Sequence, residues 1–515
     1  MRSPNEGWRS ARSGARRPAA TPPVPAPALP GPAAGLPLPA ARPTPTHGRW
    51  AGRRAPAAAA AAPTVPADGG PENIAASYDW PWKGVSWSLT LVGFLLYIVV
   101  ITTYELPIGD VAMGAALFGL VLLRTGYHFP ATLGWMAAFL VWTAVSGLQS
   151  PYQWEVQPHV IDFGKLFLIA LVLVNAVRTK ENIRLYAVLF LGCFALYPMR
   201  GAIFNYVGGY TLYGRALWNH VYANPNDLAA LTLLQLSLAV SLLRSEFHRW
   251  TRYCVYLGCA MLPILVLMTQ SRGAFLALAV FVAFFLAGQR RRARALVSVL
   301  AIAAVVVMVA PGGVWKRVSG LKSATTEEGI AAADQEGSAK QRYQIWQVAG
   351  RVIADHPAFG VGFGAYPVAH SEYVVTGRGA RFARGERDTH STYLNVLAET
   401  GFIGLGLFLG MLGSAFFTAE RVRRRWRKVY PDAAQQLYAL ELGLIAFLVA
   451  GIFGSFAKLS FLYLHLMLLV VVAAWLNEAA TARQAAVAAP RGAAPIGRGR
   501  GGRAGGAAPR PVTLT

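Results

Sequence analysis

Two short segments of the chain carry residues that could handle an anionic substrate. In the first, Met268–Ala274, Arg272 lies between two apolar runs that almost no loop separates. In the second, His390 follows Asp388 and precedes a long apolar run. A guanidinium can bind two phosphate oxygens at once, and a neutral imidazole can accept a proton near pH 7. These residue types indicate binding of a phosphate or diphosphate beside a general base.

Other polar residues could support such a site. Arg200 and Arg215 lie in a stretch rich in aromatics and glycine, and either could supply a second guanidinium. Asp388 or Glu399 could orient the ring of His390. Arginines shortly before His390 should lower its pKa and keep the ring neutral, because they disfavour its cation; these are Arg378, Arg381, Arg384 and Arg387.

The elements that must position these residues are membrane helices. Of the 515 residues, 55% are hydrophobic and only 14% are charged, whereas a soluble domain carries about 25% charged residues. An apolar run of about 17–25 residues can span a bilayer, and it must be helical there because lipid offers no partner to an open backbone. Twelve such runs occur, near 85–103, 108–123, 131–147, 160–177, 183–199, 227–243, 253–270, 273–288, 295–310, 392–418, 437–455 and 459–477. The sequence predicts an all-α polytopic membrane protein with these twelve transmembrane helices.

The short basic loops predict the orientation of these helices. Lys and Arg cluster in every second gap between the runs, at 178–184, 244–252, 290–294 and 421–428. The positive-inside rule places these gaps and both termini in the cytoplasm. Arg272 and His390 then lie on the outer side, where the runs 273–288 and 392–418 begin. The N-terminal end of a helix favours an anion, so both runs would present a suitable end there.

One large outer segment, 311–390, separates the ninth and tenth runs. Within it, Ser338–Asp355 predicts one amphipathic helix, because Ile345, Val348, Ala349 and Val352 keep helical spacing and His356-Pro357 follows. Gly360–Gly364 follows no strand, so it is no dinucleotide fingerprint and we expect a flexible turn. The arginines near the end of the segment could serve the site or form a solvated basic strip.

The two ends of the chain differ from the middle. Residues 1–78 are rich in Pro, Ala and Arg, and residues 483–515 contain Gly-Arg repeats. Neither composition can bury a core, so we expect disordered cytoplasmic tails around a membrane domain at 79–482. No apolar run precedes residue 85, so no cleavable signal peptide is expected. Much of the formal net charge of +24 lies in the tails, which favours attraction to membrane lipid over nucleic-acid binding.

Together the candidate residues indicate group transfer from a lipid-linked diphosphate whose tail lies in the bilayer. His390 would take a proton from an acceptor hydroxyl as that oxygen attacks the anomeric carbon of a sugar. Arg272, with Arg200 or Arg215, would stabilise the charge that grows on the leaving diphosphate. No acidic cluster in the sequence resembles a metal site, so we expect a metal-independent reaction without a cofactor.

Several short motifs follow in a fixed order along the chain: Thr269–Phe275, Arg342 with Trp346, Pro357, Gly360–Gly364 and His390–Gly404. Through them, the chain resembles the O-antigen ligase and O-antigen polymerase superfamily of bacterial envelope glycosyltransferases. Two further segments, Arg200–Phe204 and Asn224–Asp227, look more like the exosortase-associated O-glycosylation ligase branch. The resemblance covers roughly residues 80–480 and excludes both tails.

The resemblance implies a GT-C-like fold and inverting transfer of a glycan from undecaprenyl diphosphate. The active site would lie on the periplasmic side of the bacterial inner membrane. The family's paired arginines and histidine match Arg272, His390 and Arg200, with Arg215 competing for the last role and Arg342 in a supporting one. The acceptor would be a hydroxyl of lipid A-core, of a protein or of another lipid-linked glycan.

Other functions remain open on the sequence alone. An O-antigen or exopolysaccharide polymerase would use the same site, and only the acceptor would differ. A cell-wall-type glycan polymerase would instead use an outer carboxylate, such as Asp334 or Asp388. A transporter or flippase would carry charged or broken sites near the bilayer midplane and often two related halves. The charges of the apolar runs cluster at their ends instead. A non-catalytic envelope scaffold is the last alternative.

Overall fold

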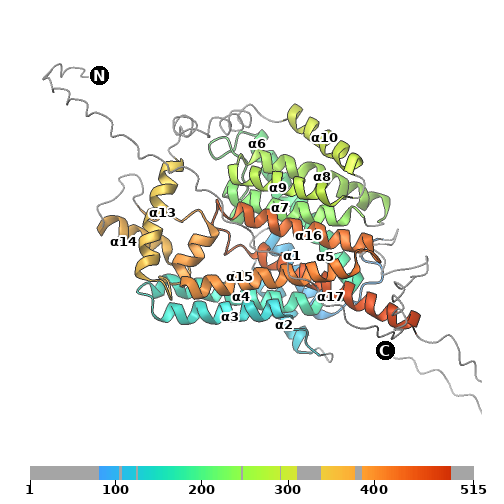
Figure 1. The fold of residues 1–515 in the computed structure, drawn as a ribbon, viewed down its shortest axis with the longest axis horizontal. Coiled ribbons are helices and arrows are strands. Elements are labelled where there is room, and N and C mark those ends of the chain that lie inside the picture. The colour runs from blue at the N-terminus through green and yellow to red at the C-terminus, as the bar shows by residue number, and fades with distance from the viewer. Residues whose placement is uncertain are drawn as a thin grey trace, which may run out of the picture. The chain divides into compact units, whose positions relative to one another are not determined.

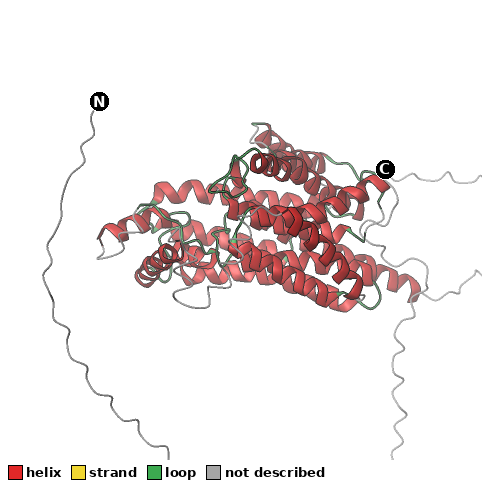
Figure 2. Ribbon diagram, turned by 90° about the horizontal axis from the view of Figure 1, so that it is seen from above, coloured by secondary structure: helices red, strands yellow, loops and turns green. Residues whose placement is uncertain are grey.

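The computed structural model describes residues 80–103, 107–122, 126–244, 247–289, 292–309, 338–376 and 385–488. All of them belong to one compact unit, Val65–Thr515. Regular structure in these ranges is helical, and the one β-bridge joins Leu212 to Arg215 (Figure 2). The tail expected at 1–78 lies outside the described residues. The last helix runs on to Ala488, past residue 482, and the rest of the C-terminal tail lies outside the described residues.

Each of the twelve apolar runs coincides with a helix (Figure 1). In chain order these are α1 (Leu89–Thr102), α2 (Ile108–Val121), α3 (Ala131–Leu148), α4 (Gln153–Ala176), α5 (Lys180–Phe194), α7 (Pro225–Leu242), α8 (Arg249–Met268), α9 (Arg272–Gly288), α10 (Arg292–Val309), α15 (Thr392–Trp426), α16 (Pro431–Ala450) and α17 (Ser460–Ala488). Within the described ranges, eight helices are long and apolar enough to cross a membrane, while α1, α2 and α9 are shorter apolar helices. The predicted all-α polytopic membrane protein is confirmed.

The fifth run is longer than the sequence predicted. After α5 the chain passes through a π-helical turn, η1 (Ala195–Met199), which contains Pro198, and continues as α6 (Arg200–Val207). Proline cannot donate the regular helical hydrogen bond, and a π-turn accommodates such a defect without ending the helix. Arg200 therefore begins a further helical segment.

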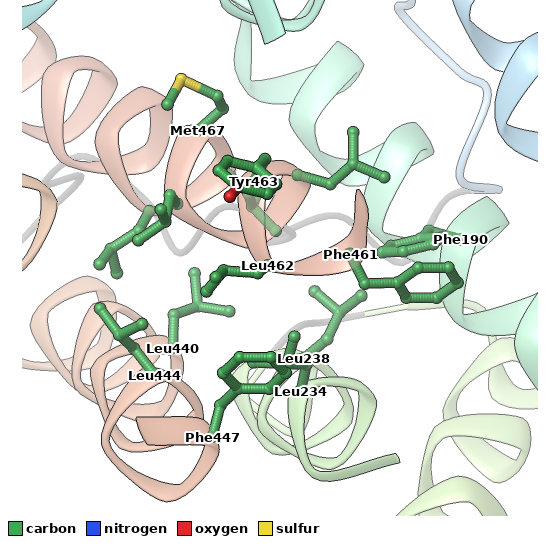
Figure 3. Close-up of a cluster of buried hydrophobic side chains, with 14 of the residues drawn as sticks. Phe190, Leu234, Leu238, Leu440, Leu444, Phe447, Phe461, Leu462, Tyr463 and Met467 are labelled. Atoms are coloured by element: carbon green, nitrogen blue, oxygen red, sulfur yellow. The ribbon is translucent and has the colours of Figure 1, made fainter. Parts of the chain in front are cut away.

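The centre of the helical unit is formed by α7, α16 and α17, which pack against one another. Most side chains of these three helices are buried. Figure 3 shows part of this core, in which Leu234 and Leu238 of α7 lie near Phe447 of α16, and Phe190 of α5 lies beside Phe461 of α17. By contrast, α3, α8 and α15 expose large apolar side chains such as Trp135, Leu257 and Phe417. An apolar exterior is expected where lipid replaces water around a helix.

The predicted amphipathic helix is confirmed as α13 (Ser338–Asp355). Its apolar face is closed off from solvent, with Ile345, Val348, Ala349 and Val352 at 0–5% exposure. These side chains form a second apolar cluster with residues of α4, of α14 (Tyr366–Thr376) and of α15. In Figure 1, α13 and α14 lie together at one end of the helical bundle.

The turn expected to be flexible at Gly360–Gly364 is instead closely packed. All three glycines have positive φ, between 70° and 106°. Val361 N donates to Ala398 O and Gly362 N donates to Glu399 O, each at 2.9 Å. A Cβ on Gly360 would meet backbone atoms of Glu399 at 2.4 Å, so only glycine fits. The N–H groups of the turn bind two carbonyls of α15 just before Gly401. Gly401 has a φ of 69°, which kinks that helix.

Candidate active site

Arg272 is the first residue of α9 and follows a tight turn, Thr269–Ser271, after α8. Gln270 in this turn has a left-handed φ of 51°. Its side-chain amide donates to Gly214 O at 2.7 Å, which ties the turn to the loop between α6 and α7. The Arg272 side chain is exposed at the N-terminal end of the helix. Backbone N–H groups and the helix dipole make that end favourable for an anion.

Arg215 is fixed beside the same turn. Its Nε donates to Thr269 O at 2.8 Å, and one of its terminal nitrogens donates to Asn226 Oδ1 at 2.6 Å. The next residue, Ala216, donates its N–H to Met268 O at 3.0 Å. The structure therefore brings Arg215 and Arg272 together around one three-residue turn.

Arg200 is placed differently. It is exposed at the start of α6, and its guanidinium carbon lies 5.1 Å from the centroid of the Phe204 ring on the same helix. The next residue, Gly201, packs against Trp218, so α6 covers the loop that carries Arg215. Arg200 thus packs on its own helix, whereas Arg215 bonds the turn that precedes Arg272.

His390 lies in the short connection before α15, with a left-handed φ of 51°. Neighbours hold this connection on both sides. Trp346 of α13 donates its indole N–H to Thr389 O at 2.8 Å, and Thr389 Oγ1 donates to Ser391 O at 2.8 Å. A branched or bulky residue rarely adopts positive φ unless its surroundings impose it. The anchors therefore set the direction of the imidazole.

The loop between α16 and α17 joins the arginine cluster to His390. Thr392, which begins α15, donates its N–H to Gly451 O at 2.8 Å and its hydroxyl to Gly454 O at 2.6 Å. On the other side, a Cβ on Gly273 would lie only 2.8 Å from Phe453 Cβ. The helix that begins with Arg272 and the helix that begins just after His390 therefore pack against one loop.

A second connection runs through the start of α7. Arg215 bonds Asn226, and the neighbouring Asp227 is close enough to Asp388 for their charges to interact. Asp388 interacts electrostatically with His390 in turn. Two independent sets of contacts thus converge on the same end of the bundle.

Burial lowers the pKa of His390 from its ordinary value, and the positive charge of Arg342 lowers it further. Asp388 opposes this shift and Arg387 adds to it. Arg342 is half-buried on α13, one helical turn before Trp346. The expected direction of the shift is confirmed, although burial outweighs the arginines as its cause. The ring is therefore neutral near pH 7 and able to accept a proton.

Arg378, Arg381, Arg384 and Asp334 lie outside the described residues.

A buried polar chain leads inward from Asp388. Asn395 Nδ2 donates to Asp388 Oδ1 and to Glu399 Oε1, each at 3.2 Å. Lys458 Nζ donates to Glu399 Oε1 at 3.4 Å, and the Glu399 side chain is fully buried. Asp388 acts on His390 directly, whereas Glu399 reaches it through Asn395 and Asp388. Asp388 is thus the better placed of the two carboxylates to influence the imidazole.

Sequence analysis missed Asn395 and Lys458 as parts of this chain. Asn395 and Glu399 stand four residues apart on one helix, so their contact could have been inferred from spacing. Lys458 lies between the last two apolar runs, in a gap on the side of the bundle where Lys and Arg are rare. That unusual position was the feature of the sequence that could have indicated its role. Within the described residues, no group of three or more His, Cys, Asp or Glu side chains could hold a metal ion.

Backbone strain concentrates in the same segments. In the part of the chain that the structure describes, four non-glycine residues have positive φ: Tyr213, His220, Gln270 and His390. Two flank Arg215 in the loop between α6 and α7, one lies two residues before Arg272, and one is the histidine itself. Strained backbone of this kind persists where surrounding contacts impose it, and it gathers at functional sites.

Comparison with known families bears on the same region. Residues 257–409 match the family model described as O-antigen ligase. The match includes Arg272, Arg342, Asp388, His390 and Glu399, whereas Arg200 and Arg215 precede it. No curated protein matches the chain. The narrower likeness to the exosortase-associated branch depends on residues before the match and stays a prediction. Over residues 257–409 the chain thus matches the O-antigen ligase family, which supports the predicted resemblance to the O-antigen ligase and polymerase superfamily.

Proposed function

We propose that this membrane protein transfers a glycan from undecaprenyl diphosphate to an acceptor hydroxyl, as an O-antigen ligase-type enzyme. The reaction takes place at the periplasmic face of the bacterial inner membrane, with both termini in the cytoplasm. The lipid tail of the donor lies along the apolar exterior of the bundle. Its diphosphate lies at the end where α9 and α15 begin.

In the proposed step, His390 takes the proton of the acceptor hydroxyl. The acceptor oxygen forms a bond to the anomeric carbon while the bond from that carbon to the diphosphate oxygen breaks. Undecaprenyl diphosphate leaves with the electron pair of the broken bond. Attack opposite the leaving group inverts the configuration at the anomeric carbon.

Arg272 and Arg215 stabilise the charge that develops on the leaving diphosphate. The N-terminal end of α9 adds oriented backbone N–H groups to the two guanidinium groups. Asp388 and Arg342 tune the imidazole, and Glu399 supports Asp388 through Asn395. None of these roles requires a metal ion, so we expect turnover to persist in EDTA.

One observation carries the proposal: a single loop packs against both Gly273 and Thr392. It puts a guanidinium and a neutral imidazole at two helix ends that lie close together. Lipid-linked diphosphate transfer needs both, one for the leaving group and one for the acceptor proton. The matched O-antigen ligase domain covers both residues.

The test uses His390→Ala and Arg272→Ala, scored for surface glycan at matched protein levels. Losing a general base or a charge-stabilising arginine should reduce transfer by about 10²–10³-fold. His356→Ala and Arg351→Ala are suitable controls, because both residues are exposed on or just after α13. Normal glycan in both site variants would refute the proposed site.

Deletion of the gene separates ligase from polymerase within the proposed reaction. A ligase mutant accumulates long lipid-linked glycan that is not passed to its final acceptor. A polymerase mutant retains single repeat units, because the site that joins them is missing. The accumulated lipid-linked species is read directly by its size after extraction.

A further inference from the structure

A cavity of about 610 Å³ lies at the end of the bundle opposite the candidate active site. It is bounded by the last residues of α7 and α9 and by the first turns of α10 and α16. These helix ends are remote from Arg272 and His390, which lie where α9 and α15 begin. The cavity is therefore separate from the proposed transfer site.

The lining of this cavity is amphiphilic. Leu243, Phe285 and Ala439 provide apolar wall, and Arg244, Arg294 and Gln289 provide polar groups. A soluble anion would bind the guanidinium groups but make no favourable contact with the apolar wall. An uncharged hydrocarbon would contact the apolar wall but leave the two guanidinium groups without an anion. A ligand that matches both parts carries a negative head and an apolar chain.

Arg244 is held in place in the lining of the cavity by two side-chain contacts. Its NH1 contacts Asp432 Oδ1 at 3.1 Å, and its NH2 donates to Gln289 Oε1 at 3.4 Å. A guanidinium has five N–H donors, so these two bonds leave others for an anion. The Asp432 carboxylate partly offsets the charge of Arg244, and Arg294 at the start of α10 restores the positive balance. Two guanidinium groups suit the oxygens of a phosphodiester.

The surroundings favour a lipid as the source of that phosphate. On α10, which borders the cavity, Leu296, Val297 and Leu300 are 45–65% exposed and extend the apolar surface along the helix. A bilayer would cover such a surface, so acyl chains would be present beside the cavity. Basic pockets between membrane helices are suited to anionic lipid head groups.

We propose that the cavity between α7, α9, α10 and α16 binds an anionic phospholipid. Its phosphodiester lies between Arg244 and Arg294, and one acyl chain follows Leu243, Phe285 and Ala439. The bound lipid fastens α10 to the bundle, because its phosphate bridges Arg294 of α10 and Arg244, which follows α7.

The test is native mass spectrometry of the purified full-length protein, released from micelles that contain phosphatidylglycerol and phosphatidylcholine with identical acyl chains. The wild type should retain phosphatidylglycerol preferentially. Arg244→Gln and Arg294→Gln should each weaken that retention about tenfold, as expected for one charge-assisted contact. Ala295→Trp, which places a bulky ring in the cavity lining and keeps both arginines, should also weaken it.

Arg249→Gln is the matched control. Arg249 is the first residue of α8, its guanidinium carbon lies 5.6 Å from the centroid of the Trp250 ring, and it does not line the cavity. The proposal is overturned if this variant loses lipid as strongly as Arg244→Gln, or if the wild type shows no preference. Displacement by millimolar inorganic phosphate, or equal binding of a short-chain phosphatidylglycerol, would also contradict it, because either result shows a simple anion site.

Discussion

At the scale of single residues, burial and the charges of neighbouring residues control the protonation of His390. The imidazole must be neutral to accept a proton, so activity falls as pH drops through its pKa. Burial and Arg342 lower that pKa from its ordinary value, so the acidic limb of the rate profile should lie below about pH 6.5. The dependence of kcat/KM on pH, measured with purified protein and lipid-linked donor, tests this.

Two substitutions should move that limb in opposite directions. Arg342→Gln removes a positive charge that disfavours the imidazolium, so the pKa rises and the limb moves to higher pH. Asp388→Asn removes a negative charge that favours it, so the limb moves to lower pH, while the amide oxygen can still accept from Thr389 N. Shifts in the same direction, or no shift in either variant, would contradict the assignment of His390 as base.

The second residue-scale prediction concerns the partner of Arg272. Arg215 contacts the Thr269–Ser271 turn, whereas Arg200 contacts its own helix. Arg215→Lys keeps the charge but loses the forked donors, so kcat/KM for the donor should fall about 10²-fold. Arg200→Lys should change it by less than about threefold, since that side chain packs on Phe204 of its own helix. A larger effect at Arg200 than at Arg215 would reverse the assignment.

At the scale of elements, the loop between α16 and α17 is the structural link between Arg272 and His390. Thr392 Oγ1 donates to Gly454 O at 2.6 Å and accepts from Phe456 N at 2.9 Å. Thr392→Val keeps the shape of the side chain and removes both bonds. Because a displacement of 1 Å between catalytic groups can cost about 10²-fold, kcat should fall markedly while the protein still folds.

Thr232→Val on α7 is the control for this substitution. Thr232 is also fully buried, but its hydroxyl bonds only Leu228 O of the same helix, at 2.6 Å. Thr232→Val should therefore leave turnover unchanged, whereas Thr392→Val should lower it, with thermal unfolding measured for both variants. Equal turnover in both would show that the loop does not position the site.

The elements also show how far the sequence predicted the site. Arg272 and His390 could be assigned to one end of the bundle because apolar runs alternate in direction and basic loops mark one side. Their approach to each other through Phe453 and Gly454 could not be predicted, since it depends on a loop more than 180 residues beyond Arg272. The contact between Lys458 and Glu399 could not be predicted either, because it also joins segments that are far apart in the sequence. Helical spacing predicts neighbours on one helix, but not which helices meet.

At the scale of the whole molecule, the helix positions followed from hydrophobicity because lipid permits few backbone arrangements. The packing at Gly360–Gly364 did not follow, and the expected flexible turn is wrong. Glycine-rich composition permits both a mobile loop and a tight turn with positive φ. The choice depends on Ala398 O and Glu399 O, which accept bonds from the turn only because Gly401 kinks α15.

The proposed orientation of the bundle is the property on which the whole mechanism depends. Single cysteines at Glu386 and Lys428, two exposed positions, report on the two ends of α15. In a background with Cys193, Cys254 and Cys259 replaced, Glu386→Cys should react in intact spheroplasts with a maleimide that cannot cross membranes. Lys428→Cys should react only after the membrane is opened, because the positive-inside rule places the basic end in the cytoplasm. The reverse pattern would put His390 in the cytoplasm, where the proposed periplasmic transfer is impossible.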